Sequence, residues 1–571
     1  MNDDKRTFQE RHGAKRCEIQ AAAFPFATAA PLSRPLLLLA FAAGLASGFT
    51  QTPLPDSLNP MAGGAVLAMA VQADGKILVG GGFSTLGGQL RSCLGRLNPD
   101  GSLDTSFNPV VERDGQVYVR SLLIQQDGKI VVGGWFSTVG GQPRANLARL
   151  NVDGTLDSAF NPGACCAVCS LLLLPNDKIL VGGTFWELAG QPCGGIGRLN
   201  PDGSLDTGFD PVGGADGTVY SMAVQPDGKL LVAGSFKTLA GQPRNNLGRL
   251  DAEGSLDSEF DPKPNGPVYA LMVQPEGQIL VAGWFDWLAG DGRTKLARLN
   301  ADGTRDPDFH PTPASVGNPS VHCLALQADG KILIGGEFSS IDGKPRVSLA
   351  RLNADGTVDD EFNPGSGSQV FSLAVQADGK TLVGGTFTTL GGQTRSCLGR
   401  LNNTEPATEH LDNDGSTITW RRGGTSPEVS GTIFEASTNG MAWTSLGSGT
   451  HMAGGWRLTG VSALPNAIVR ARGFVTGGHY NGSSWFVEGL WRGFSQAPPA
   501  IRTTDNDFGF TSNQFGFNIV GTAGQVVVVE GSTNLCQWTP LGTNTLGPIP
   551  LHFNQSDSWQ AGRAFYRVRL W

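Results

Sequence analysis

The chain has 571 residues, of which 81 are glycine and only 16% are charged, and its formal net charge is −8. Glycine is about twice as frequent as its usual share of ~7%, while 29 Phe and 12 Trp supply ample core material. This composition excludes a disordered chain and, because glycine follows no three-residue period, collagen. An isoelectric point near 5.5 argues against a nucleic-acid binder that relies on a basic surface.

Residues 1–51 have the features of an export leader. Several Lys and Arg precede an apolar run of 14 residues, 35–48. That length suits the core of a signal peptide better than a membrane span, which needs about 20 residues. Ala46, Ser47 and Gly48 offer small residues for cleavage. We therefore predict a bacterial protein that is secreted or held at the cell surface, with no stable membrane span after cleavage. An uncleaved anchor is the alternative.

A repeat of about fifty residues fills residues 53–402 with seven copies. Arg-Leu-Asn or Arg-Leu-Asp recurs at spacings of 49 to 53 residues, together with a string similar to QADGKILVGGxF. Each unit predicts four short strands, here called a to d, which in a central copy read VYSMAVQ, GKLLVAGSF, NNLGRLD and SLDSEF. Runs rich in Val, Leu and Phe that are bounded by Gly, Asp and Pro are typical of strands. Four strands at this period indicate a propeller blade, and a solenoid is the alternative.

The ends of the array favour a ring over a solenoid. Residues 53–60 align with a strand d (compare residues 102–109), whereas no strand d follows Asn402. We expect the N-terminal segment to complete the last blade, which would remove an exposed sheet edge. The predicted fold class is therefore all-β, with a seven-bladed β-propeller at residues 52–403 followed by two small β-sandwich-like modules.

The turn between strands c and d carries a repeated polar signature. Residues 98–101 (Asn-Pro-Asp-Gly) predict a type I turn followed by a glycine bulge. In that register Arg96 faces Asp104, and five further blades repeat this pairing, while Pro55 takes the Asp position opposite Arg400. We interpret the signature as cross-strand ion pairs. Calcium binding by N-x-D-G-x-x-D is the alternative, and we predict no other cofactor.

Nine cysteines do not form a regular disulfide framework in a chain of this length. Four of them, Cys165, Cys166, Cys169 and Cys193, gather in one repeat, which allows a disulfide between the first group and Cys193 without fixing the pairing. Zinc binding is disfavoured, because no paired CxxC and no nearby His completes a site.

Residues 53–402 resemble the delta-60 repeat, a bacterial repeat of unassigned function that is expected to form β-propellers. The strings that carry the resemblance are similar to DGKILVGG-x-F and GRLNPDGSLD-x-x-F-N-P and recur seven times. The resemblance implies the propeller fold. It implies no catalytic residue and no ligand.

A different repeat occupies residues 404–571. Residues 435–447 match residues 530–542 at an offset of 95, and each copy ends on an alternating strand near Arg470 or Arg567. We predict one module at residues 404–497 and a second at 498–571, divided by a Pro-rich linker. The first resembles a fibronectin type III sandwich with Trp420 in its core, although Ile468 stands about where that family keeps a Tyr. Trp443 and Trp538 are interpreted as core residues rather than ligand platforms.

The sequence contains no catalytic motif in a useful context, whether HExxH, GxSxG or GxxxxGK[ST]. Our first hypothesis is a non-catalytic binding or adhesion protein, whose partner is an extracellular glycan or protein and not a nucleic acid. A secreted glycan hydrolase or lyase is the alternative, since carboxylate pairs can converge from distant blades. A purely structural surface protein is a third reading.

Variation among the seven units predicts where a ligand would bind. The a–b and c–d turns are short and nearly invariant, whereas the d–a and b–c connections on the opposite face vary in length and chemistry. Aromatic and charged side chains at these variable ends suit a sugar or peptide, and neutral drift on a solvated face is the alternative. The entrance of strand a holds Leu67, Arg120, Cys169, Tyr220, Tyr269, His322 and Phe371, a ring expected near the central channel. The predicted ligand-binding residues are Arg120, Trp135, Tyr220, Tyr269, Trp284, His322 and Glu337.

Overall fold

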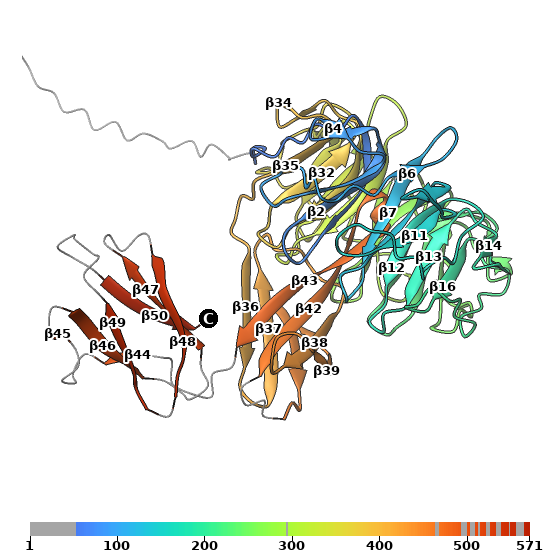
Figure 1. Cartoon of the computed structure of the whole chain (residues 1–571). Coiled ribbons are helices and arrows are strands. Elements are labelled where there is room, and N and C mark those ends of the chain that lie inside the picture. The colour runs from blue at the N-terminus through green and yellow to red at the C-terminus, as the bar shows by residue number, and fades with distance from the viewer. Residues whose placement is uncertain are drawn as a thin grey trace, which may run out of the picture. The chain divides into compact units, whose positions relative to one another are not determined.

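The fold is described from a computed structural model (Figure 1), which describes residues 53–292, 295–462, 467–492, 500–502, 509–511, 514–520, 526–532, 538–547, 549–555 and 565–570. The predicted leader lies outside the described residues. Residues 50–571 form one compact unit by their contacts. Apart from a one-turn 3-10 segment at His479–Asn481, all the regular elements in the described residues are β-strands. No helix in the described part of the chain is long and apolar enough to cross a membrane.

Seven similar antiparallel blades follow one another between residues 64 and 401. In each blade strand b lies between strands a and c. The a strands are β1 (Gly64–Val71), β7 (Tyr118–Ile124), β12 (Val168–Leu173), β17 (Thr218–Val224), β22 (Val268–Val273), β26 (Ser320–Leu326) and β31 (Val370–Val375). The b strands are β2 (Ile77–Phe83), β8 (Ile130–Trp135), β13 (Ile179–Gly183), β18 (Leu230–Ser235), β23 (Ile279–Gly283), β27 (Ile332–Glu337) and β32 (Thr381–Gly385). The c strands are β5 (Leu94–Leu97), β11 (Leu147–Leu150), β16 (Ile196–Leu199), β21 (Leu247–Leu250), β24 (Leu296–Leu299), β30 (Leu349–Leu352) and β35 (Leu398–Leu401).

The b–c connections form their own small hairpins in six blades, and two d–a connections add a strand beside them. The hairpins are β3–β4 (Thr85–Leu86, Gln89–Leu90), β9–β10 (Thr138–Val139, Gln142–Pro143), β14–β15 (Glu187–Leu188, Gln191–Pro192), β19–β20 (Thr238–Leu239, Gln242–Pro243), β28–β29 (Ser340–Ile341, Lys344–Pro345) and β33–β34 (Thr389–Leu390, Gln393–Thr394), with β6 (Val111–Glu112) and β25 (Pro313–Ala314) as the added strands.

The prediction of a full strand d is wrong. The predicted turn is confirmed, because Gly101 has a φ of 91° and its amide donates to Asn98 O at 2.9 Å. After it, however, the chain pairs with strand c only through a single bridge, Leu97 with Leu103 in the first blade. The reason is the next Asp: Asp104 Oδ1 accepts from the amide of Ser106, which turns the backbone away from the sheet.

The N-terminal segment pairs with the last strand c, as expected. Pro55 bridges Leu401, and the amide of Asp56 donates to Arg400 O at 2.9 Å. The expectation that Pro55 faces Arg400 is wrong: Asp56 does so, with its Oδ2 2.6 Å from Arg400 Nε. The gapless alignment failed because this segment has one residue fewer between its Asp and its buried apolar residue, Leu58, than the other units have.

The predicted Arg–Asp pairs are confirmed in six blades, and each carboxylate also binds a Lys or Gln that begins strand b. Asp257, for example, lies 2.9 Å from Arg249 and 2.8 Å from Lys229. Burial alone would raise the pKa of Asp257, but the hydrogen bond from Lys229 and the charge of Arg249 lower that pKa to about 2. The pairs are Arg96–Asp104, Arg149–Asp157, Arg198–Asp206, Arg249–Asp257, Arg298–Asp306 and Arg351–Asp359.

The first C-terminal module contains two sheets. One has the order β36-β37-β41-β40, and the other runs β39-β38-β42-β43 and continues into the second blade through a parallel bridge between Ser484 and Leu123. Trp420 is fully buried, as predicted. The strands are β36 (Thr408–Asn413), β37 (Thr417–Gly423), β38 (Thr432–Ser437), β39 (Thr444–Ser448), β40 (Thr450–Met452), β41 (Gly455–Thr459), β42 (Ile468–Gly477) and β43 (Ser483–Arg492).

The last part of the chain repeats a motif of the first module. Arg470 binds Glu435 and stacks on Trp443, and Arg567 likewise binds Glu530 and stacks on Trp538. Both tryptophans are half-buried beneath an arginine rather than fully in a core. The strands are β44 (Ala500–Arg502), β45 (Gly509–Thr511), β46 (Gln514–Val520), β47 (Val526–Ser532), β48 (Thr539–Thr545), β49 (Leu551–Gln555) and β50 (Phe565–Leu570).

Candidate functional site

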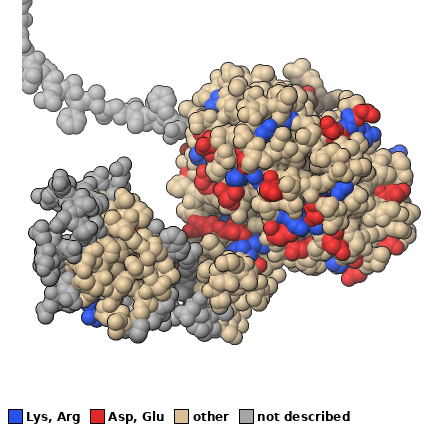
Figure 2. Space-filling view, in the orientation of Figure 1, with Lys and Arg blue, Asp and Glu red and all other residues tan. Residues whose placement is uncertain are grey.

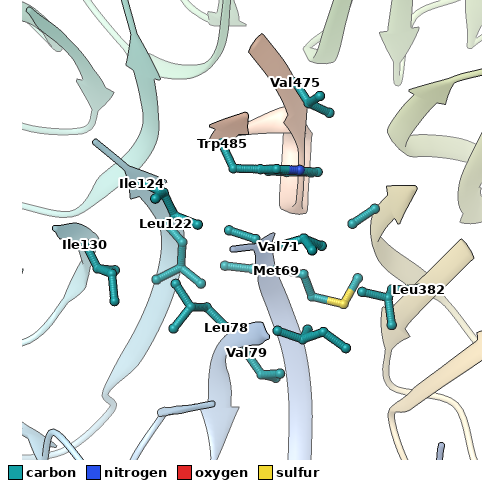
Figure 3. Close-up of a cluster of buried hydrophobic side chains, with 14 of the residues drawn as sticks. Met69, Val71, Leu78, Val79, Leu122, Ile124, Ile130, Leu382, Val475 and Trp485 are labelled. Carbon is teal, nitrogen blue, oxygen red and sulfur yellow. The ribbon is translucent and has the colours of Figure 1, made fainter. Parts of the chain in front are cut away.

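A hairpin of the first C-terminal module lies among the a strands of the propeller. It consists of β42, β43 and the tight turn of residues 478–482, and we call it the plug hairpin. Trp485 and Val475 of the plug hairpin belong to one continuous buried cluster with Met69, Val71 and Leu122, and Figure 3 shows Trp485 facing Val71 and Met69. Trp485 has no solvent exposure. The module and the propeller therefore share a hydrophobic core.

The turn of the plug hairpin is hydrogen-bonded to the inner edges of the a strands. Ser483 Oγ accepts from Leu122 N at 3.1 Å, and Asn481 Oδ1 accepts from Leu324 N at 2.8 Å. Gly482 O accepts from Leu171 N at 2.9 Å. An unpaired strand edge attracts other backbone, and here the turn satisfies amides at the same repeat position in three different blades.

Two glycines allow this close approach of backbone to backbone. A Cβ at Gly482 would stand 2.5 Å from Cys169 O, and a Cβ at Gly477 would stand 2.6 Å from Leu373 O. Both distances are shorter than any ordinary carbon–oxygen contact. The sequence analysis missed this turn, although Gly-Gly-His-Tyr-Asn-Gly between two alternating segments is a recognisable hairpin signal.

Four neighbouring members of the predicted ring at the entrance of strand a, Tyr220, Tyr269, His322 and Phe371, lie side by side. Ring centroids of neighbouring members are 5.6 Å apart for Tyr220 and Tyr269, and 5.5 Å apart for Tyr269 and His322. The turn of the plug hairpin fills the centre of the ring, since Tyr480 lies 4.9 Å from Tyr220 and 4.8 Å from Tyr269.

Four of the predicted ligand-binding residues therefore contact or adjoin the chain's own turn. They are Arg120, Tyr220, Tyr269 and His322, all half-buried. Arg120 Nη1 lies 3.7 Å from Cys169 Sγ and its guanidinium stacks over Tyr118. These residues form a floor across the channel, and any ligand on this side would meet the floor together with Tyr480.

Two neighbouring histidines, His322 of the floor and His479 of the plug hairpin, are held neutral by burial. Burial lowers the pKa of His322 to about 4. The pKa of His479 is also lowered, first by burial and then by the charges of Arg120 and His322. His322 Nε2 lies 2.8 Å from Ser320 Oγ. The neutral rings can then stack with the aromatic rings around them.

The other three predicted residues lie at the ends of b strands, away from the plug hairpin. Trp284 is 44% exposed and Glu337 is exposed. Trp135 is half-buried under Arg113, whose guanidinium carbon lies 3.6 Å from the ring centroid. Gln369 donates to Glu337 Oε2 at 2.6 Å. The structure thus separates the seven predicted residues into a floor and a rim.

Two further tryptophans extend the rim. Trp186 is 66% exposed and Trp287 is 47% exposed, and both lie in b–c connections. The sequence analysis compared a single repeat position and so passed over them, although both follow the strand b Phe directly or one residue later. Figure 2 shows that acidic and basic side chains are interspersed over the surface it draws. On that surface no single sign of charge prevails.

The cysteine cluster contains free thiols. Cys165, Cys166, Cys169 and Cys193 form no disulfide in the structure, so the proposed bridge to Cys193 is not made. Among the described residues, no group of three or more His, Cys, Asp or Glu could hold a metal ion. In the c–d turns Asp104 already binds Arg96 and Lys76, which would compete with calcium. Calcium binding stays an untested alternative.

One protein family matches the blades. Its description is "Domain of unknown function (DUF5122) beta-propeller", and it matches residues 72–107, 125–160, 174–209, 225–260, 274–309, 327–362 and 376–404. Seven segments of the chain, one in each blade, are therefore similar to this beta-propeller family. The description assigns no function.

Similar solved structures were also found. The "Crystal structure of WD40 beta propeller domain of Doa1" is 15% identical, covering 62% of this chain and 98% of that one, with a TM-score of 0.41. Two crystal structures of Salmonella alpha-2-macroglobulin, one reacted with methylamine and one the mutant Y1175G, are each 11% identical, with TM-scores of 0.12 and 0.11. Each covers 87% of this chain, which spans 38% and 37% of theirs. No curated protein sequence matches the chain.

Proposed function

Starting from seven beta-propeller repeats, we propose that this chain is a non-catalytic binding protein that acts outside a bacterial cell. The ligand is an extracellular glycan or protein. This ligand binds the propeller face that carries the d–a and b–c connections. The propeller fold supports a binding or scaffold role. The extracellular location rests on the leader-like sequence of residues 1–51.

One observation carries the proposal: exposed or half-exposed tryptophans gather at the b–c ends of three blades. Three of them, Trp186, Trp284 and Trp287, are between 44% and 66% exposed. Exposing a large apolar side chain to water is unfavourable, and tryptophan and arginine are enriched among residues that dominate binding energy. Trp135 with Arg113 over its ring presents both.

The floor supports a broad and shallow site. Because the plug hairpin occupies the centre of the ring, a ligand cannot thread the channel without displacing Tyr480. A polysaccharide or a protein surface can instead contact the tryptophan rim and the floor at once. The delta-60 name for the repeat and the fibronectin type III character of residues 404–497 stay predictions.

The test is an array of glycans and extracellular proteins probed with the full-length chain. Changing Trp135, Trp186, Trp284 and Trp287 together to Ala should reduce binding at least tenfold with little effect on the melting temperature. The matched control is Trp443→Ala, which removes another Arg-stacked tryptophan outside the propeller. Equal affinity of the quadruple variant would place the site elsewhere. Polysaccharide cleavage that a single Asp or Glu substitution abolishes would instead support the enzyme alternative.

A further inference from the structure

A large cavity lies on the opposite face, where the a–b turns meet the first C-terminal module. Its volume is about 630 Å³, within the range of roughly 300–1,000 Å³ typical of small-molecule sites. The propeller contributes the ends of the a strands of the third to seventh blades, and the module contributes residues 427–432, residues 448–451 and part of β42. Exposed residues such as Pro226 and Thr450 mark its opening to solvent.

The body of the cavity is apolar. Leu172, Val224 and Met272 line it from three different blades. Phe474 of β42 and Trp456 of β41 line it from the module, and both are nearly fully buried. A preformed apolar cavity of this size favours a ligand with a hydrophobic body.

One end of the cavity is acidic. Glu428 lines it and also lines an adjoining cavity of about 230 Å³, which contains Glu276, Asp329 and Arg422 as well. Three carboxylates therefore stand near one guanidinium. That guanidinium is itself shared, since Arg422 Nη1 lies 3.6 Å from Glu409.

The Glu428 carboxyl is incompletely satisfied as an anion. The amide of Val429 donates to Oε1 at 2.9 Å. Burial raises the pKa of Glu428 to about 7, although the hydrogen bond from Val429 and the charge of Arg422 oppose the rise. A cation placed beside this carboxyl would therefore be bound by charge in a partly desolvated site.

We propose that this cavity binds a hydrophobic amine, with its apolar body among Leu172, Val224, Met272 and Phe474 and its ammonium group at Glu428. The site is separate from the tryptophan rim and goes beyond the function proposed above. Other ligand heads fit less well: a carboxylate would meet Glu428, with Glu276 and Asp329 in the adjoining cavity, and an alcohol would leave the charge of Glu428 without a partner. His451, whose ring lies 5.2 Å from that of Trp456, borders the same end.

The proposal is tested by calorimetric titration of the full-length chain with octylamine, using 1-octanol and octanoate as matched probes. Octylamine should bind at least tenfold more tightly than either. Glu428→Gln should weaken octylamine binding about tenfold and leave 1-octanol unchanged. Since Glu428 ionises near pH 7 while the amine stays charged, octylamine affinity should rise about tenfold from pH 6 to pH 8. His451, Glu276, Asp329 and Arg422 face the same end and are retained in Glu428→Gln, so the rise with pH should be absent from that variant.

A second variant tests the place of binding. Val224→Phe narrows the cavity and should weaken the binding of both octylamine and 1-octanol. Val152→Phe adds the same ring at a position that is 50% exposed and outside the cavity, so it should change neither. Absence of octylamine binding, equal binding of the three probes, or octylamine binding that Glu428→Gln does not weaken would each overturn the proposal.

Discussion

In each blade one Asp carboxylate binds an arginine and a Lys or Gln. The same arginine also contacts the neighbouring blade. Arg249 binds Asp257 within its own blade, while its Nη1 donates to Ala301 O of the next blade at 2.6 Å. Its guanidinium also lies 4.5 Å from the ring centroid of Phe260. The repeated arginine therefore stabilises both the blade and the contact between blades.

Asp257→Asn is expected to destabilise the protein by roughly 2 kcal/mol. The substitution keeps the shape of the side chain but removes the charge that Arg249 and Lys229 share, and it leaves Arg249 buried without its counter-ion. The free energy of unfolding in urea measures the effect. Asp114→Asn, at an exposed position, is the control and should be neutral. Equal stability of the two variants would contradict a structural role for the pairs.

The sequence predicted these arginine pairs because turn chemistry fixes their register. The Asn-Pro-Asp-Gly turn sets which residues of strands c and d oppose each other, and six blades follow it. The Lys or Gln that shares each carboxylate, such as Lys76 with Asp104, comes from the a–b turn directly before strand b. Its approach depends on the twist of the blade, which no local pattern encodes. Asp56 was missed for a similar reason, because a one-residue deletion after it shifts a gapless alignment.

At the scale of the element, the plug hairpin is the feature that a repeat analysis could not supply. Its strands are long and alternating, and their signal is readable. Their place among the a strands depends on contacts between residues more than 100 positions apart, such as Leu324 N with Asn481 Oδ1. The ring near the channel could be predicted because its members occupy one repeat position. That Tyr480 fills the ring could not be predicted, because Tyr480 is far from the ring residues in the sequence.

Gly482→Ala is expected to loosen the plug hairpin and to destabilise the chain by about 1–3 kcal/mol. The added methyl would collide with Cys169 O and strain the hydrogen bond from Leu171 N. Thermal unfolding followed by tryptophan fluorescence measures the loss, because Trp485 is buried in the core that the module shares with the propeller. Gly431→Ala, in the same module with open space around it, serves as the matched control. A melting temperature as high as that of the control would argue against close docking.

Mild acid is expected to weaken the packing of the plug hairpin against the a strands. The pKa of His322 is about 4 in the folded protein and near 6.5 when unfolded. Its contribution to stability is therefore complete above pH 6.5 and is lost as the pH falls toward 4. His479, Tyr269, Phe371 and Tyr480 surround its ring, and none of them offers it an anion.

Comparison with a His322→Phe variant isolates this effect from other titrating groups, such as Glu428. Between pH 7 and pH 5, the wild-type chain should lose roughly 1–2 kcal/mol more stability than the variant. Urea unfolding at the two pH values provides the measurement. Parallel pH dependence of the two proteins would show that His322 takes up its proton as readily in the folded chain as in the unfolded chain. That result would contradict the prediction.

At the scale of the whole molecule, two separate contacts join the first and last blades. The N-terminal segment pairs with the last strand c, and Arg400 Nη1 of the seventh blade donates to Pro99 O of the first at 2.8 Å. The sequence predicted this joining because a strand-d-like segment was missing at one end and present at the other. The same reasoning could not predict where the first C-terminal module packs, since nothing in the repeat refers to it.

Deletion of residues 53–60 is expected to lower the melting temperature and promote aggregation. It removes Asp56 from Arg400 and Lys380 and exposes the outer edge of β35. Light scattering and thermal unfolding of the deleted and full-length chains measure both effects. A monodisperse deletion variant with unchanged melting temperature would contradict the role of this segment.

The central claim is that the chain's own hairpin fills the centre of the propeller, between the inner edges of the a strands. Hydrogen exchange of the full-length chain tests this most directly, at the amides of Leu122, Leu171 and Leu324, which bind the turn. We predict that these amides, together with residues 477–484, exchange as slowly as the centres of the b strands. Exchange as fast as in the exposed a–b turns would contradict the account.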